Sequence, residues 1–151
     1  MIRRNAFASL LCTAALVAAG FAVYSPVALG QPAEKQTMAA MSSDQREACI
    51  TMSAACAAAC GKASEYCTNM AKNGKGEHAA MAALASDCGA CCASCLAFVS
   101  RNSQLSPAMC ECCAKCCDQC AAACDKVDGQ AMKDCAKACR DCAAACRAMG
   151  K

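Results

Sequence analysis

The segment from Met109 to Cys124 constrains the fold of this chain most strongly, because seven of its sixteen residues are cysteines. In a helix, at about 100° per residue, these thiols would cover about 160° of one side. Ordinary core packing does not require so many thiols on one face, so we interpret the segment as one wall of a metal-binding interior. The seven residues are Cys110, Cys112, Cys113, Cys116, Cys117, Cys120 and Cys124.

The first thirty residues form a separate segment with the features of an export signal. Arg3 and Arg4 precede an apolar run that continues to Val23, and small residues follow up to Gly30. We expect a signal peptide over residues 1–30, cleaved after Gly30, and an exported, periplasmic protein. The arginine pair favours the twin-arginine route, although the ordinary secretory route remains open. Because no comparable apolar run follows, we expect no membrane span in the mature chain.

The mature chain, residues 31–151, has too few large apolar side chains for an ordinary core. Loss of Cys12 with the signal leaves 20 − 1 = 19 cysteines, and a domain of this size normally buries many more aliphatic and aromatic residues than this one contains. Alanine is abundant and favours helices, so we expect cysteine and alanine to form the core. The few large core formers are Ile50, Leu84, Leu96, Phe98, Val99, Leu105 and Val127.

Signals for helix ends divide the mature chain into an arm and four helices. Asp44 and Glu47 have the spacing of a capping box, and Ser106 followed by Pro107 is typical of an N-cap with proline at the first helical position. Asn-Gly and Asp-Gly pairs end two of the helices. We expect a flexible arm over residues 31–43 and helices over about 45–73, 77–100, 106–128 and 130–149.

Cysteines recur at spacings of 3, 4 and 7 in the other helices too, and so fall on one side of each. They are Cys49, Cys56, Cys60 and Cys67 in the first helix, Cys88, Cys91, Cys92 and Cys95 in the second, and Cys135, Cys139, Cys142 and Cys146 in the fourth. Four helices joined by short links favour an all-α, antiparallel up-down four-helix bundle over residues 44–151. We expect every cysteine stripe to face inward and to line its core.

The spacing of the cysteines favours metal binding over disulfide formation. Residues four apart on a helix, such as Cys56 and Cys60, have Cβ atoms about 5 to 6 Å apart, whereas a disulfide requires about 3.5 to 4.5 Å. A metal ion accommodates the longer separation, because two metal–sulfur bonds of about 2.3 Å hold the sulfurs about 4 to 4.6 Å apart. A disulfide-stapled exported helical protein remains the alternative.

Charge favours Cu(I) as the bound metal, in multiple ions. Buried thiolates are unstable as free anions, and a monovalent soft cation can neutralise roughly one thiolate each while bridging sulfurs share ligands between ions. Zinc with four thiolates retains negative charge and requires a tetrahedron, so a zinc or general metal buffer is the weaker alternative. An iron–sulfur CxxCxxC run with a following Cys-Pro is absent.

Four further candidate ligands fall where an entrance to the core is expected. In an up-down bundle the end of the first helix, the start of the second, the end of the third and the start of the fourth meet at one end. Met70, His78, Met81 and Met132 lie in these segments. Alternatively, the methionines fill gaps in the core, His78 is an ordinary surface histidine, and Cys112, at the edge of its stripe, is a peripheral thiol.

Other functions are disfavoured by what the sequence lacks. There is no basic run and almost no aromatic residue, so we expect no nucleic-acid binding. The single histidine, His78, has no evident catalytic partner, and the acidic residues read as capping and solubility charges. We therefore expect no enzyme activity.

Rows of cysteines of the CxxxC and CxxCC types run along the alanine-rich helices, from Cys56 to Cys60, Cys88 to Cys95, Cys110 to Cys124 and Cys135 to Cys146. In this pattern the chain resembles the bacterial copper storage proteins. The resemblance implies a four-helix bundle that stores many Cu(I) ions, mainly through pairs of thiolates, and takes them up at one open end. It also implies a role in copper homeostasis, with a cuproenzyme or copper chaperone as recipient, and a homotetramer.

Overall fold

Four helices make up nearly all of the part of the chain that the structure describes. The computed structural model describes residues 42–149, so the expected signal peptide (1–30) and nearly all of the expected arm (31–43) lie outside it. The helices are α1 (Ser43–Lys72), α2 (Ala79–Ser100), α3 (Ser106–Cys124) and α4 (Gln130–Ala148), with a short 3₁₀ turn, η1 (Gly76–His78), before α2. The predicted all-α class is confirmed.

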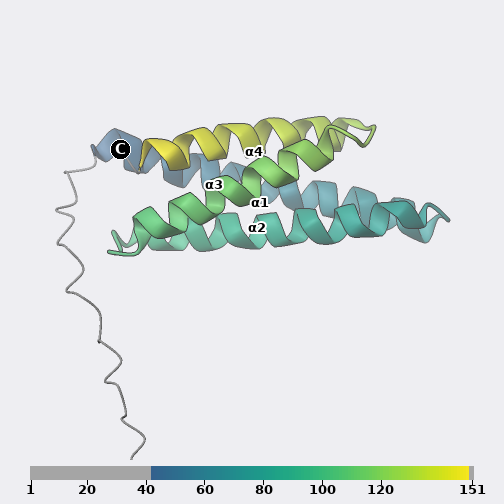
Figure 1. Ribbon diagram of the computed structural model, residues 1–151, viewed down its shortest axis with the longest axis horizontal. Coiled ribbons are helices and arrows are strands. Elements are labelled where there is room, and N and C mark those ends of the chain that lie inside the picture. The colour runs from purple at the N-terminus through teal and green to yellow at the C-terminus, as the bar shows by residue number, and fades with distance from the viewer. Residues whose placement is uncertain (1–41, 150–151) are drawn as a thin grey trace, which may run out of the picture. The chain divides into compact units, whose positions relative to one another are not determined.

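The helices form an antiparallel bundle around a common interior (Figure 1). α1 packs against α2 and α4, and α3 packs against the same two helices. Among residues 42–149, the diagonal pairs α1–α3 and α2–α4 make no close backbone contact. The links after α1 and after α3 lie at the same end of the bundle (Figure 1). The predicted up-down topology is therefore confirmed, and each helix has one side available to line the interior.

α1 begins earlier than predicted, at a different cap. The Ser42 Oγ accepts a hydrogen bond from the Gln45 backbone N–H at 3.1 Å, and the Gln45 Oε1 accepts one from the Ser42 N–H at 3.2 Å. This reciprocal pair is a capping box, so the box predicted from Asp44 and Glu47 is wrong. Asp44 instead lies in the first turn, where its negative charge is favourable near the helix N-terminus.

The start of α3 also differs from the prediction. Ser106 is buried, and its hydroxyl donates to the Phe98 carbonyl at 3.1 Å instead of capping its own helix. Leu105 is the N-cap residue and makes no side-chain capping hydrogen bond. Pro107 stands in the first turn as predicted. Ser106 therefore ties the start of α3 to the last turn of α2.

The link from α3 to α4 is longer than predicted, because α3 ends at Cys124 and not near Asp128. Gly129 has φ of +129° and turns the chain into α4. Tyr66 of α1 donates a hydrogen bond to the Asp128 carbonyl at 3.0 Å, and a Cβ at position 129 would lie 2.9 Å from the Tyr66 Oη. Glycine is required here both by the backbone conformation and by the close approach of Tyr66.

Small side chains let α1 and α2 approach closely. Gly89 of α2 faces α1, since a Cβ built there would lie 3.3 Å from the Cys60 Cβ. The buried residues of the bundle are mostly cysteine and alanine, and Met132 and Val99 are the largest fully buried side chains. The prediction that cysteine and alanine form the core is confirmed.

The segment Gly76–Ser100 is long and apolar enough to cross a membrane, with a mean hydropathy of 1.7 over its most apolar stretch. It is a second apolar run, contrary to the expectation that none follows the signal. Alanine and cysteine supply most of its apolar character, and the segment packs against α1 and α3 within the bundle. Its hydropathy therefore follows from the composition of the core to which it contributes.

Candidate metal centre

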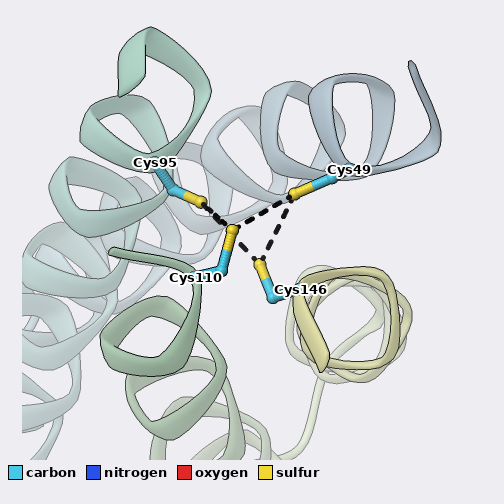
Figure 2. Close-up of side chains that lie close together, drawn as sticks. All are labelled: Cys49, Cys95, Cys110 and Cys146. Carbon is cyan, nitrogen blue, oxygen red and sulfur yellow. Dashed lines mark hydrogen bonds between the residues drawn. The ribbon is translucent and has the colours of Figure 1, made fainter. Parts of the chain in front are cut away.

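One cysteine from each helix meets in a ring of four thiols (Figure 2). The Cys49 Sγ lies 3.9 Å from the sulfurs of both Cys110 and Cys146. The Cys95 Sγ lies 3.7 and 3.8 Å from the same two sulfurs. All four side chains are at most 1% exposed. Four soft ligand atoms from four helices thus converge in a site closed to solvent.

At least three further groups of four buried cysteines continue the interior, and within each group all sulfurs lie within 4.8 Å of one another. Shared members connect the groups. Cys56 belongs to two of them, and its Sγ lies 3.6 Å from that of Cys139 and 3.9 Å from that of Cys60. Cys113 joins them at 3.8 Å from Cys92. The groups are Cys56, Cys60, Cys88 and Cys139; Cys56, Cys92, Cys117 and Cys142; and Cys60, Cys120, Cys135 and Cys139.

The core thiols are in contact but not bonded to one another. All the cysteines of residues 42–149 are free, and their closest sulfur contacts, such as Cys92 to Cys117 at 3.6 Å, are far longer than the S–S bond of about 2.0 Å. The same contacts are close to the separation of about 4 to 4.6 Å between two sulfurs on one metal ion. Small side-chain shifts would therefore be enough to bind ions between them.

The buried thiols differ in acidity, because each has other thiols around it in place of water. Hydrogen bonds, chiefly from Cys113, lower the pKa of Cys117 to about 6, and hydrogen bonds led by that of Cys110 lower the pKa of Cys95. Burial raises the pKa of Cys67. The core thus contains thiols ready to ionise beside neighbours that stay protonated, and it would release protons as metal binds.

Three of the predicted core cysteines lie outside the core. Cys91 of α2 and Cys112 and Cys116 of α3 form a group of their own, with all three sulfurs within 4.8 Å of one another. Cys112 is exposed and the other two are half-buried. The expectation that every stripe faces inward is wrong for these thiols. Cys112 and Cys116 lie at the edge of a face about 160° wide, which extends beyond the side of α3 that meets the core, and Cys91 lies at one edge of the α2 stripe. The alternative view of Cys112 as a peripheral thiol agrees with its exposure.

Ser53 is a core position that the cysteine pattern missed. It is 0% exposed, and its Oγ lies 3.7 Å from the Cys142 Sγ. The signal was present in the sequence, because Ser53 stands four residues after Cys49 and three before Cys56 and so shares their side of the helix. A hydroxyl therefore occupies a place in the core where the surrounding positions carry thiols.

A pocket of about 370 Å³ opens at the end of the bundle where α1 and η1 meet the α3–α4 link. Two of the predicted entrance residues, Met70 and His78, line it, together with Tyr66 and Lys126. The Nδ1 of His78 is buried and, among the described residues, has no hydrogen-bond partner. A thioether and an imidazole, both of which can bind soft metals, thus line the pocket.

The other two predicted entrance residues are buried in the bundle. Met132 is 0% exposed, and its Sδ accepts a weak hydrogen bond from the Cys67 Sγ at 3.6 Å. Met81 is 7% exposed and does not line the pocket. The structure therefore brings Met70 together with His78, and Met132 together with Cys67, while Met81 stands apart from the pocket.

A four-helix bundle whose interior consists of closely spaced free thiols belongs, by fold and chemistry, to the soft-metal-binding proteins. The model of a family described as copper storage protein matches residues 42–151 of this sequence. The chain therefore belongs to the copper storage protein family.

Two solved structures are similar to this chain. The Nmul_A1745 protein from Nitrosospira multiformis is 32% identical with a TM-score of 0.62, covering 72% of this chain and 97% of that one. Apo-Csp3, copper storage protein 3, from Bacillus subtilis is 30% identical with a TM-score of 0.62, covering 70% of this chain and 98% of that one. A comparison with curated sequences gave no match. Membership of a storage family supports the expectation that the chain is not an enzyme.

Proposed function

We propose that this chain stores Cu(I), binding many ions through the cysteine thiolates of its core. The observation that carries the proposal is the succession of thiol groups contributed by different helices, with contacts such as 3.6 Å between Cys56 and Cys139. These contacts need little adjustment to reach the separation of about 4 to 4.6 Å that one ion imposes on two sulfurs. Because neighbouring groups share thiols, bridging sulfurs can serve more than one ion.

The charge of the core supports a monovalent ion. Within residues 42–149 the only buried polar residues are Ser53 and Ser106, and no buried side chain carries a positive charge. The bound ions themselves must therefore offset the thiolates, because uncompensated buried charge is costly. Zinc ions with separate sets of four thiolates leave excess negative charge, whereas Cu(I) with bridging thiolates approaches one ion per thiolate and prefers such ligands.

The proposed ligands are the predicted set, with different roles inside and outside the core. The buried thiols hold the stored ions, while Met70 and His78 bind copper at the pocket and pass it to Cys67 and Met132. Met81 is a remaining candidate within the bundle. Support for this path comes from the unpaired His78 Nδ1 and from the 3.6 Å contact between Cys67 and Met132.

Export and partners belong to the same proposal. The arginine pair and apolar run of residues 1–30 support export to the periplasm, and the resemblance to copper storage proteins supports a homotetramer that supplies a cuproenzyme or copper chaperone. We propose no catalytic role. Detection of the mature chain in a periplasmic fraction tests the location, and its recovery in the cytoplasm with residues 1–30 still attached would contradict it.

Anaerobic titration of the reduced mature chain with Cu(I), in competition with a chelator of known affinity, tests the proposed function. We expect uptake of many ions, up to roughly one per core thiolate. A variant in which serine replaces Cys56, Cys60 and Cys139 should bind markedly fewer. Uptake of only one or two ions, or thiols that react only after reduction, would refute storage.

In the same assay, the variant Met70→Leu with His78→Phe should load more slowly to an unchanged capacity. A loading rate equal to that of the wild type would exclude the proposed entrance.

A further inference from the structure

The group formed by Cys91, Cys112 and Cys116, which we call the outer thiol site, is not used by the storage core. Its three sulfurs lie within 4.8 Å of one another. Cys112 and Cys116 stand four residues apart on α3 and so project from the same side of that helix, and Cys91 approaches them from α2. Because Cys112 is exposed and the other two are half-buried, the site can be reached from solvent without opening the bundle.

We propose that the outer thiol site binds one Cu(I) ion and exchanges it with dissolved thiol or thioether ligands faster than the core exchanges its own ions. The proposal rests on the proposed storage of Cu(I). Each thiol that binds the ion gives up its proton to solvent, three Cu–S bonds form, and no electron is transferred. Cu(I) enters as a complex with a small thiol or thioether, which leaves as the cysteines replace it.

The number and spacing of the sulfurs fit this ion. Three metal–sulfur bonds of about 2.3 Å in a plane would place the sulfurs about 4 Å apart. This separation is compatible with the structure, in which no two of the three sulfurs are more than 4.8 Å apart. A single ion on three thiolates is negatively charged, and the partial exposure of all three cysteines lets water solvate that charge. The same exposure admits an incoming ligand, which the closed ring of Cys49 and its partners does not.

The outer thiol site is a neighbour of the core. On α3, Cys113 and Cys117 face the core groups and directly follow Cys112 and Cys116. Cys116 is therefore adjacent in sequence to a core thiol, and the outer thiol site lies between α2 and α3 and not among the residues that line the pocket.

Protection from alkylation tests whether the site binds copper. The reduced mature chain, with and without Cu(I), is treated with iodoacetamide, and modification at Cys112 is followed by mass spectrometry. When free Cu(I) is held at 100 times the dissociation constant of the site, we expect the rate at Cys112 to fall about 100-fold. An unchanged rate would refute the proposal, as would a disulfide among the three cysteines in protein isolated without added reductant.

Removal of copper by a chelator tests the exchange. We expect the loaded wild type to lose one ion in a fast phase, and a variant with Cys91→Ser, Cys112→Ser and Cys116→Ser to lack that phase and keep the remaining capacity. The matched control replaces Cys49, Cys95 and Cys110 by serine, and it should keep the fast phase while binding fewer ions. Circular dichroism checks that both variants fold. A fast phase that persists in the outer variant would overturn the proposal.

The two proposals fail in different ways. A wild type that binds many ions but leaves Cys112 unprotected would refute the outer thiol site and leave storage intact. A wild type that binds only one ion, with Cys112 protected, would support the outer thiol site and refute storage in the core.

Discussion

Ser53 is, of the two buried polar residues within 42–149, the one that contacts a core thiol. Ser53 has the surroundings of a core cysteine, since the Cys142 Sγ lies 3.7 Å from its Oγ and Cys49 and Cys56 flank it along α1. Only its own side-chain atom differs, because it carries an oxygen in place of a sulfur. A hydroxyl is a poor ligand for Cu(I), whereas a thiolate at the same place would be a good one.

The substitution Ser53→Cys should therefore raise the copper capacity of the chain by about one ion, because it supplies a missing soft ligand among existing ones. Anaerobic Cu(I) titration measures the change. Ala54→Cys is the matched control, because position 54 is exposed on the same helix and a thiol there has no core thiols around it. Equal capacities for wild type and Ser53→Cys would show that this part of the core does not bind metal.

At the level of the helices, close packing of α1 on α2 depends on a glycine. The Cβ of Cys60 lies 3.3 Å from the place where a Cβ at position 89 would stand, and the Ala57 carbonyl lies 3.6 Å from it. Glycine at position 89 lowers the stability of the helix itself, but it lets the cysteine row of α1 lie close against α2. Gly61, also within a helix, has no atom within 4 Å of such a Cβ.

These two glycines make a paired prediction. Gly61→Ala should stabilise the metal-free protein by about 0.5 to 1 kcal/mol, the ordinary gain of alanine over glycine in a helix. Gly89→Ala should lose this gain and destabilise the protein by about 1 kcal/mol or more, because overpacking forces α1 and α2 apart. Urea denaturation measures both. If both variants were stabilised equally, the contact between α1 and α2 at Gly89 would be looser than described.

For the molecule as a whole, burial of many thiols makes the free energy of unfolding decrease as the pH becomes alkaline. Burial is the chief cause that raises the pKa of Cys67, Cys91 and Cys116 above the ordinary value of 9.0. Above that value the unfolded chain loses these protons while the folded protein keeps them. Stability then falls as pH rises, whereas thiols with lowered pKa are ionised in both states and contribute no slope there.

We therefore expect the metal-free protein to lose stability between about pH 9 and pH 10, by up to about 1.4 kcal/mol per pH unit for a fully buried thiol such as Cys67. Denaturant titrations across this range measure the slope. Cys67→Ala should reduce it, and the copper-loaded protein should lack it because its thiolates are already deprotonated. A metal-free protein equally stable across the range would show that burial does not hold these protons.

Most of the fold and of the core could be predicted from the spacing of the cysteines, because a stripe of apolar thiols in each of four helices can be buried together only by turning inward. The side to which Cys91 and Cys116 turn could not be predicted, since a residue at the edge of a stripe faces in or out depending on the rotation of its helix. Ser53 was missed as a core residue because the prediction followed the cysteines, whereas only its position on the helix places it in the core. The cap at Ser42 could not be predicted because the side chains of Ser42 and Asp44 can both accept a hydrogen bond from a backbone N–H two or three residues later. Both residues were therefore plausible N-caps.

The four thiol groups of the core described above each draw on three or four different helices. An ion held by such a group cross-links segments far apart in the chain, so that no single helix can detach while its ions stay bound. Proteases generally cut segments that have unfolded locally, and this route is closed once the core is loaded. With copper stored as proposed, the lifetime of the loaded protein is then set by exchange of copper with other ligands, and digestion of the chain follows only after the store has been emptied.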